Sequence, residues 1–170
     1  MSNQTSLCFR KASGVPLFHS SEKKLTSSIE HLLKSKVQVG EKVLLLYPPN
    51  IDYVVTFYGC LLAGVIAVPA PLPKNNSSQV IDIVNECDPV LVLTTLREVS
   101  AIKTFWEKHK GLINQLSIFT SDNSVSHFGD LEACLDLNPE ASAYVHYFSD
   151  SKNMNKSITL THNDIIENIL

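Results

Sequence analysis

The sequence predicts an α/β fold with a mostly parallel sheet and helices on both of its faces. Two observations indicate this class. Short, continuous apolar runs of strand length recur along the chain, which is typical of strands buried on both faces. Amphipathic stretches of helical length separate these runs, as βαβ units require. The 170 residues, 44% of them hydrophobic, are enough to bury one core.

The first helix and strand follow a polar start. Ser20 or Ser21 can cap a helix that runs towards Lys34 and carries leucine and isoleucine on one face. A strand is predicted over Lys42–Tyr47, where four apolar residues are continuous, and Pro48 ends it.

The next unit has clear boundaries. Asn50 is the expected N-cap of a helix over Ile51–Ala63, and Gly64 is its expected C-terminal stop. The apolar run Val65–Val68 is predicted as a strand that Pro69 ends.

The alternation continues in the second half of the chain. The predicted elements are a helix from Ser77 or Ser78 through Cys87, a strand over Val90–Leu93, a helix over Leu96–Lys110, strands over Gln115–Phe119, Ala143–Phe148 and Ile158–Leu160, and a last helix after Thr161. Thr161 and Asp164 form a capping-box pattern. Residues 121–141 are expected to be loop with one helical turn around Leu131–Leu135, and Ser149–Ser157 to be a polar loop.

The charge excludes a nucleic-acid partner. Lys and Arg number 14 against 17 Asp and Glu, which gives a net charge of −3. Only Arg10 and Arg97 are arginines, and no basic stripe of the kind that nucleic-acid binders show is present.

The cysteines and the apolar stretches indicate a reduced, soluble setting. The four cysteines form no CxxC pair, and the six histidines lack metal-ligand spacing, so we expect no metal site. The first residues lack a signal-peptide core. The longest apolar stretch, Val54–Ala70, is interrupted by Gly and Pro and is too short for a membrane span. We therefore expect a cytoplasmic protein without a membrane span.

One loop is a candidate for phosphate binding. Ser149–Ser157 follows a buried strand and so belongs at the carboxyl edge of the sheet, where such folds bind ligands. Its Ser and Lys residues could hold a phosphate. The loop has no glycine, which phosphate loops use to let backbone N–H groups converge, and Asp150 adds a negative charge.

Two segments carry a family resemblance. GEKVLLLYPPNIDY, residues 40–53, and FYGCLLAGVIAVPA, residues 57–70, resemble the start of an acyl-adenylate-forming enzyme of the fatty acyl-AMP ligase branch. The resemblance extends from about Leu25 to the C-terminus. It implies the first subdomain of that fold.

The phosphate loop of that family, YTSGSTGxPKG, is followed by a short strand that ends in LTH. Tyr147, Ser149, Ser151 and Lys156, and then Leu160-Thr161-His162, fall on this pattern in register. The resemblance implies that Ser149, Ser151 and Lys156 are ATP-phosphate residues. The other loop positions depart from it: Phe148, Asp150, Lys152, Asn153, Asn155 and Ser157 stand where the family has Thr, Gly, Thr, Gly, Pro and Gly.

The resemblance also implies a function. The ancestral reaction activates a fatty acid with ATP to acyl-AMP and passes the acyl group to a carrier-protein thiol. ATP, magnesium and an acyl carrier protein are thus implied by the family. We expect a polar segment over 1–20 and, over 21–170, a partial AMP-binding domain that ends prematurely. Because the family's catalytic lysine and magnesium-associated acid lie beyond this region, we expect no catalytic residue, no metal ligand and no adenylation by this chain alone.

Two other functions stay open. One is a non-catalytic interaction module that dimerises or complements a separately encoded remainder of the ligase, since the uncovered subdomain would expose apolar surface. The other is residual nucleotide or acyl binding in a regulatory role, with a weak ATP affinity that an Asp150→Gly variant should improve.

Overall fold

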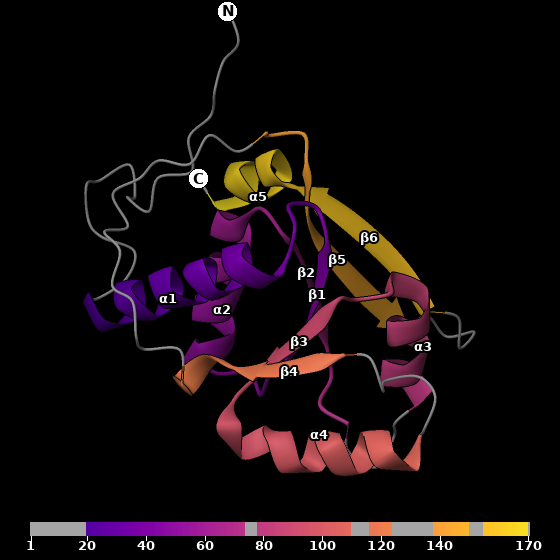
Figure 1. The fold of residues 1–170 in the computed structure, drawn as a ribbon. Coiled ribbons are helices and arrows are strands. Elements are labelled where there is room, and N and C mark those ends of the chain that lie inside the picture. The colour runs from indigo at the N-terminus through magenta and orange to yellow at the C-terminus, as the bar shows by residue number, and fades with distance from the viewer. Residues whose placement is uncertain (1–19, 74–77, 110–115, 124–137, 150–154, 170) are drawn as a thin grey trace, which may run out of the picture.

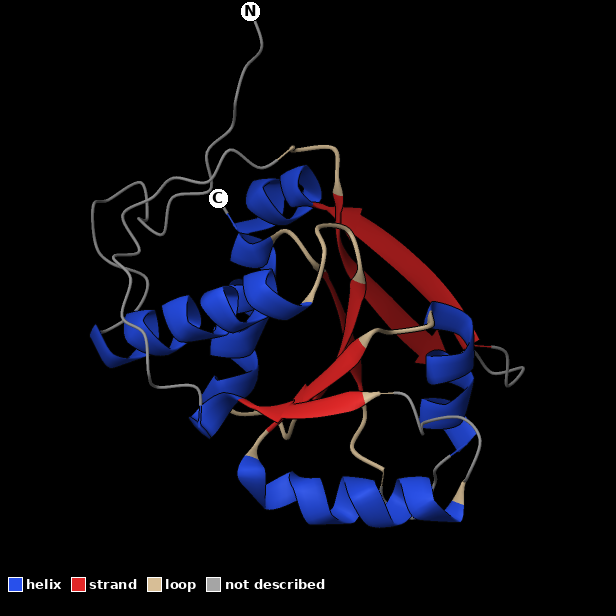
Figure 2. Ribbon diagram, viewed as in Figure 1, coloured by secondary structure: helices blue, strands red, loops and turns tan. Residues whose placement is uncertain are grey.

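A six-stranded sheet in the order β4-β3-β1-β2-β5-β6 forms the centre of the molecule (Figures 1 and 2). The computed structural model describes residues 20–73, 78–109, 116–123, 138–149 and 155–169. The strands are β1 (Lys42–Leu46), β2 (Ile66–Ala70), β3 (Leu91–Thr94), β4 (Ser117–Thr120), β5 (Ser142–Ser149) and β6 (Asn155–Thr161). The helices are α1 (Ser20–Lys36), α2 (Ile51–Ala63), α3 (Ser78–Cys87), α4 (Leu96–Lys108) and α5 (His162–Ile169), with a 3₁₀ turn at Ser121–Asn123.

The predicted α/β class is confirmed. The first five strands are parallel to one another, and β6 alone runs antiparallel, next to β5. Among the described residues, no helix is long and apolar enough to cross a bilayer.

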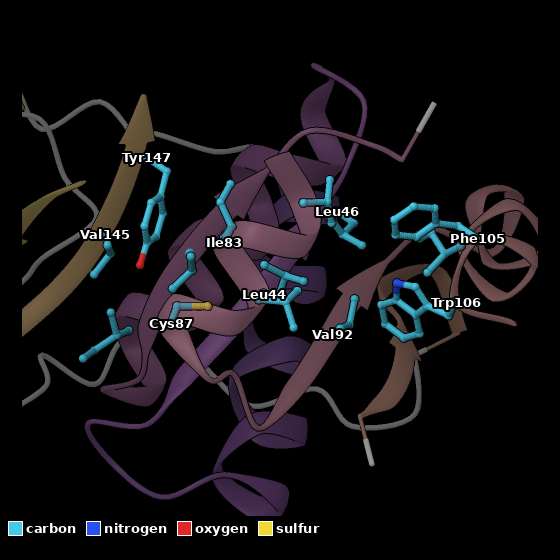
Figure 3. Close-up of a cluster of buried hydrophobic side chains, with 14 residues drawn as sticks. Leu44, Leu46, Ile83, Cys87, Val92, Phe105, Trp106, Val145 and Tyr147 are labelled. Atoms are coloured by element: carbon cyan, nitrogen blue, oxygen red, sulfur yellow. The ribbon is translucent and has the colours of Figure 1, made fainter. Parts of the chain in front are cut away.

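Helices α3 and α4 cover one face of the sheet. Alternate strand residues such as Leu44 and Val92 point to this face and pack against Ile83 of α3 and Trp106 of α4 (Figure 3). Leu44 and Val92 are completely buried, as expected for central strands of a parallel sheet.

Helices α1 and α2 cover the opposite face (Figure 1). Val43 and Leu45, the neighbours of Leu44 along β1, pack there with Ile29 of α1 and Cys60 of α2. The period of two in β1 thus divides its side chains between two cores.

Helix α2 begins and ends where its sequence predicts. The Asn50 side chain accepts a hydrogen bond from the backbone N–H of Tyr53, 3.3 Å away, and so caps the first turn. Gly64 ends the helix in the left-handed conformation, with φ of 70°, and its N–H bonds back into the last turn.

The capping box of α5 is also confirmed. The Thr161 N–H donates to Asp164 Oδ2 at 2.7 Å, and the Asp164 N–H donates to Thr161 Oγ1 at 3.1 Å. These reciprocal bonds satisfy two donors that a helix start would leave unpaired.

Several predicted boundaries are wrong. Strand β2 does not end before Pro69 but continues to Ala70, with Pro69 opposite Leu45. Strand β2 pairs with β5 at Ala67 and Tyr144, and Pro69 lies two residues beyond this pair, where a missing N–H is tolerated. The predicted loop Ser149–Ser157 is shorter, because Ser149 belongs to β5 and Asn155–Ser157 to β6.

Some predictions fall outside the described residues. These are the polar segment before Ser20, most of the loop over 121–141 with its turn at Leu131–Leu135, and residues 150–154. The first three residues of the 121–141 loop form the 3₁₀ turn.

Candidate functional site

The β5–β6 hairpin carries the residues that the sequence singles out. Because β5 is parallel to β2, its carboxyl end lies at the same sheet edge as the carboxyl ends of β1, β2 and β3. Ser149 is the last residue of β5, and Lys156 is the second residue of β6. Ser151 lies outside the described residues. The described ends of the two strands, Ser149 and Lys156, therefore lie at the edge where parallel sheets bind ligands.

The hairpin register fixes the face on which Lys156 lies. Phe148 pairs with Lys156, and His146 pairs with Ile158. Directly paired residues of antiparallel strands point to the same face, and residues two apart along a strand share a face. Lys156, which is exposed, therefore shares a face with Phe148 and His146.

A row of rings follows β5 along this face. The rings of Tyr144 and His146 stack with centroids 5.9 Å apart and planes 8° apart. The rings of His146 and Phe148 continue the row at 6.4 Å. Tyr144 Oη and His146 Nδ1 lie 3.2 Å apart, within hydrogen-bond distance.

Helix α2 extends the row. Phe57 meets Tyr144 edge to face at 5.5 Å and stacks on Tyr53 at 6.3 Å. Burial raises the pKa of Tyr53 well above its usual value of 10.0, and this tyrosine is hydrogen-bonded to Tyr144. Both hydroxyls therefore stay protonated near neutral pH. This row of rings was not predicted from the sequence. Its signal is the alternation of ring-bearing residues at positions 144, 146 and 148.

A second polar group closes the carboxyl edge between β1 and β3. The loops after these strands lead to helices on opposite faces, which makes this point a topological switch, the usual ligand crevice of such sheets. Here Thr94 Oγ1 donates to the Leu46 carbonyl at 2.7 Å, and Ser121 Oγ donates to the Thr94 carbonyl at 3.5 Å. Their hydroxyls are thus used inside the protein.

Tyr47 lies in the same group. Its hydroxyl accepts a bond of 3.2 Å from Thr56 Oγ1 and is also hydrogen-bonded to Ser121. Burial raises the pKa of Tyr47 far above 10.0. A neutral, internally bonded tyrosine is suited to hold the edge together, and the hairpin remains the candidate for ligand contact.

The described cysteines are not candidate nucleophiles. Cys60 and Cys87 are both free and buried. Burial raises the pKa of Cys87 to about 11 and raises that of Cys60 further. Both thiols therefore stay protonated at neutral pH. Only the deprotonated thiolate attacks an electrophile or binds a metal.

The same described residues offer no metal cluster. They contain no group of three or more His, Cys, Asp or Glu side chains that could hold an ion.

The comparison with protein families decides the identity of the fold. A family described as AMP-binding enzyme matches residues 23–170. The chain belongs to the AMP-binding enzyme family. The match includes the whole β5–β6 hairpin.

Relatives of this AMP-binding family chain include fatty-acid ligases. It is 28% identical over 139 residues to the medium-chain-fatty-acid–(acyl-carrier-protein) ligase JamA of Moorena producens. This alignment covers 79% of this chain and 24% of JamA. It is 28% identical over 145 residues to the long-chain-fatty-acid–AMP ligase FadD32 of Mycolicibacterium smegmatis. This second alignment covers 81% of this chain and 22% of FadD32. The family member described here thus spans less than a quarter of each of these two relatives.

Solved structures agree. The fatty acid AMP ligase from Legionella pneumophila superimposes with a TM-score of 0.69 at 25% identity, over 87% of this chain and 26% of the ligase. The McyG A-PCP structure, complexed with phenylalanyl-adenylate, gives a TM-score of 0.73 at 20% identity. The match covers 92% of this chain and 26% of the McyG chain. At that identity, McyG supports the fold alone.

Proposed function

We propose that this chain forms the first part of a fatty acyl-AMP ligase-like adenylating unit. The observation that carries the proposal is the family match over residues 23–170 together with relatives named as fatty-acid ligases. In the proposed reaction, a fatty-acid carboxylate attacks the α-phosphorus of ATP, the bond to the β-phosphate breaks, and pyrophosphate leaves. A carrier-protein thiol then takes the acyl group and releases AMP. The use of ATP fits the cytoplasmic location expected from the sequence.

The hairpin is the proposed phosphate contact. Lys156 supplies an ammonium group at the carboxyl edge, on an exposed position of β6. Ser149 and Ser151 supply hydroxyl groups at and after the end of β5. Hydroxyl and ammonium donors are suited to bind the oxygens of a triphosphate.

We further propose that the chain alone does not adenylate. The loop lacks the glycines that would let backbone N–H groups surround a phosphate, and the Asp150 carboxylate would repel it. The relatives also carry more than three quarters of their length outside the matched part. ATP and magnesium therefore belong, in this proposal, to the complete adenylating unit.

The test is fatty-acid-dependent ATP–pyrophosphate exchange with medium-chain and long-chain acids. We expect the chain alone to show no exchange above the buffer control. Robust exchange that copurifies with the chain would contradict the proposal that the chain alone does not adenylate.

A second candidate is an interaction module that completes itself with a separately encoded remainder. The ring row on α2 and β5 favours it, because its rings are partly exposed and exposed apolar surface can mark an interface. The test adds this chain to the Legionella pneumophila fatty acid AMP ligase from which the matched part has been deleted. Restored exchange would support complementation, and no binding between the two pieces would contradict it.

A further inference from the structure

The sheet holds the two ends of the β5–β6 hairpin unequally. Strands β5 and β6 pair with each other along their length, as far as Ser149 and Asn155 at the tip. Within the described part of the chain, the register of β5 with β2 consists of one pair, Ala67 with Tyr144, near the base of the hairpin. The tip is therefore joined to the sheet mainly through the base.

Pro69 removes the next donor of the ladder between β2 and β5. The Ile66 N–H donates to the Glu41 carbonyl at 2.8 Å, so Ile66 points its backbone groups to the β1 side. Successive residues of a strand point these groups to opposite sides, so Ala67 and Pro69 face β5. In this register, an N–H at position 69 would donate to the Val145 carbonyl, and proline has none.

Strand β5 also extends past the end of β2. Counted from the single pair, Ala70, the last residue of β2, lies level with Tyr147. Phe148 and Ser149 therefore continue beyond β2, with β6 as their partner. A two-stranded ribbon of this kind is only marginally stable by itself. The tip of the hairpin thus has weaker backbone support than the central strands.

The base of the hairpin, in contrast, is held from several elements. Ala143 is completely buried and packs with Leu61 of α2 and Ile165 of α5. The His162 N–H donates to the Ala141 carbonyl at 3.1 Å, which joins the start of α5 to the segment before β5. The base is therefore the fixed end of the hairpin.

A β-bulge lies between the fixed end and the tip. The register of β5 with β6 shifts between Ser142 and Tyr144, directly beside the pair with β2. A bulge bends its strand and increases the local twist. Past it, the side chains of Val145 and Tyr147 belong to the same apolar cluster as Ile83 of α3 (Figure 3). Apolar packing is non-directional, so this contact holds the tip without fixing its angle.

We propose that the β5–β6 hairpin is an arm that pivots at the Ala67–Tyr144 pair, and that Pro69 keeps its tip free of β2. The arm carries Ser149 and Lys156, so its role in phosphate contact rests on the function proposed above. Because pairing within the hairpin joins these two residues, a pivot moves them together. The four strands β4, β3, β1 and β2 keep their arrangement during this movement.

Amide hydrogen exchange of the unaltered chain, followed by NMR, tests the pivot. Since Ala67 faces β5, the backbone groups of Val145 and Tyr147 point to β2, and those of His146 point to β6. We expect the protection factor of the Tyr147 amide to be about tenfold or more below those of the Val145 and His146 amides. Equal protection of the Tyr147 and Val145 amides overturns the proposal.

A Pro69→Ala variant tests the role of the proline. It restores the missing donor, so the protection factor of the Tyr147 amide should rise by about fivefold or more, while that of His146 stays unchanged. Pro71→Ala is the matched control, because it makes the same substitution just beyond β2, and it should change neither amide.

Three outcomes overturn the proposal. These are no rise at Tyr147 in Pro69→Ala, an equal rise at Tyr147 and His146, and an equal effect of Pro71→Ala. The measurements use neither ATP nor a fatty acid. A failure of the pivot is therefore distinguishable from a failure of the ligase function, which the exchange of pyrophosphate tests.

Discussion

Gly59 of α2 lies directly against Ile29 of α1. A Cβ atom at position 59 would come within 2.6 Å of Ile29 Cγ2 and 3.3 Å of the Thr26 carbonyl oxygen. Both residues are buried, so the contact sets how closely the two helices approach. A glycine here serves the packing of two helices, and its conformational freedom is secondary.

The Gly59→Ala variant should destabilise the protein. Because one of the two nearest atoms is the Cβ of Ile29, 2.9 Å away, the helices must move apart, and overpacking of this kind costs about 1–3 kcal/mol. Urea denaturation measures the loss. Ile29→Ala removes the nearest methyl group, so the double variant should lose less than the sum of the two single variants. Additive losses would contradict direct contact.

Helix α4 has a cap from a distant residue. Its N-cap Thr95 makes no side-chain capping bond, whereas both Asp122 carboxylate oxygens lie 3.0 Å from the Leu96 nitrogen, whose N–H they accept. Asp122→Ala should therefore lower the free energy of unfolding by about 1 kcal/mol, the usual effect of losing a cap. Asp122→Asn, which keeps an acceptor, should lose less. Equal stability of the alanine variant and the unaltered chain would contradict this role.

Asp164 should give α5 a pH dependence. Hydrogen bonds from the Thr161 backbone and hydroxyl lower the pKa of Asp164 below its ordinary 3.8. The unfolded chain therefore takes up this proton first, and the stabilisation is full at neutral pH and lost as the pH falls through the carboxyl range. Asp164→Asn should be less stable than the unaltered chain at neutral pH, with the difference shrinking in acid. A stability difference that does not shrink in acid would contradict this role.

His162 should act in a different pH range. It is buried, burial lowers its pKa below 6.5, and its Nδ1 has no hydrogen-bond partner among the described residues. The unfolded chain binds the proton at a higher pH than the folded chain, so stability should fall as the pH drops through 6.5. A His162→Leu variant should lose this dependence. Parallel pH–stability curves for the two proteins would show that His162 does not cause it.

Asp150 should weaken the binding of ATP. An Asp150→Gly variant removes a carboxylate from the proposed phosphate loop and adds a flexible residue, so the dissociation constant for ATP should fall by about tenfold. Asp150→Asn removes the charge alone and should recover part of this gain. Titration calorimetry measures both. Tight binding of ATP by the unaltered chain would contradict the proposed repulsion.

The central fold could be predicted because its signals are local. The apolar runs of β1 and β3 are buried on both faces, and the caps Asn50 and Gly64 act on their own helix. These signals do not depend on distant partners. The predicted ranges of the helices and central strands therefore agree with the structure to within a few residues.

The candidate site was less predictable because its geometry depends on pairing. Lys156 and Ser157 read as loop, since an exposed edge strand needs no apolar pattern, and only pairing with Phe148 and Tyr147 places them in β6. The cap of α4 by Asp122 joins residues 26 positions apart. Neither contact has a local signal in the sequence.

Fatty-acid-dependent ATP–pyrophosphate exchange tests the central claim most directly. The assay compares the purified chain with an intact fatty acyl-AMP ligase under the same conditions. The proposed role, as the first part of an adenylating unit, predicts exchange by the intact ligase and none by this chain. Exchange by this chain alone, retained through purification and dependent on the fatty acid, would contradict it.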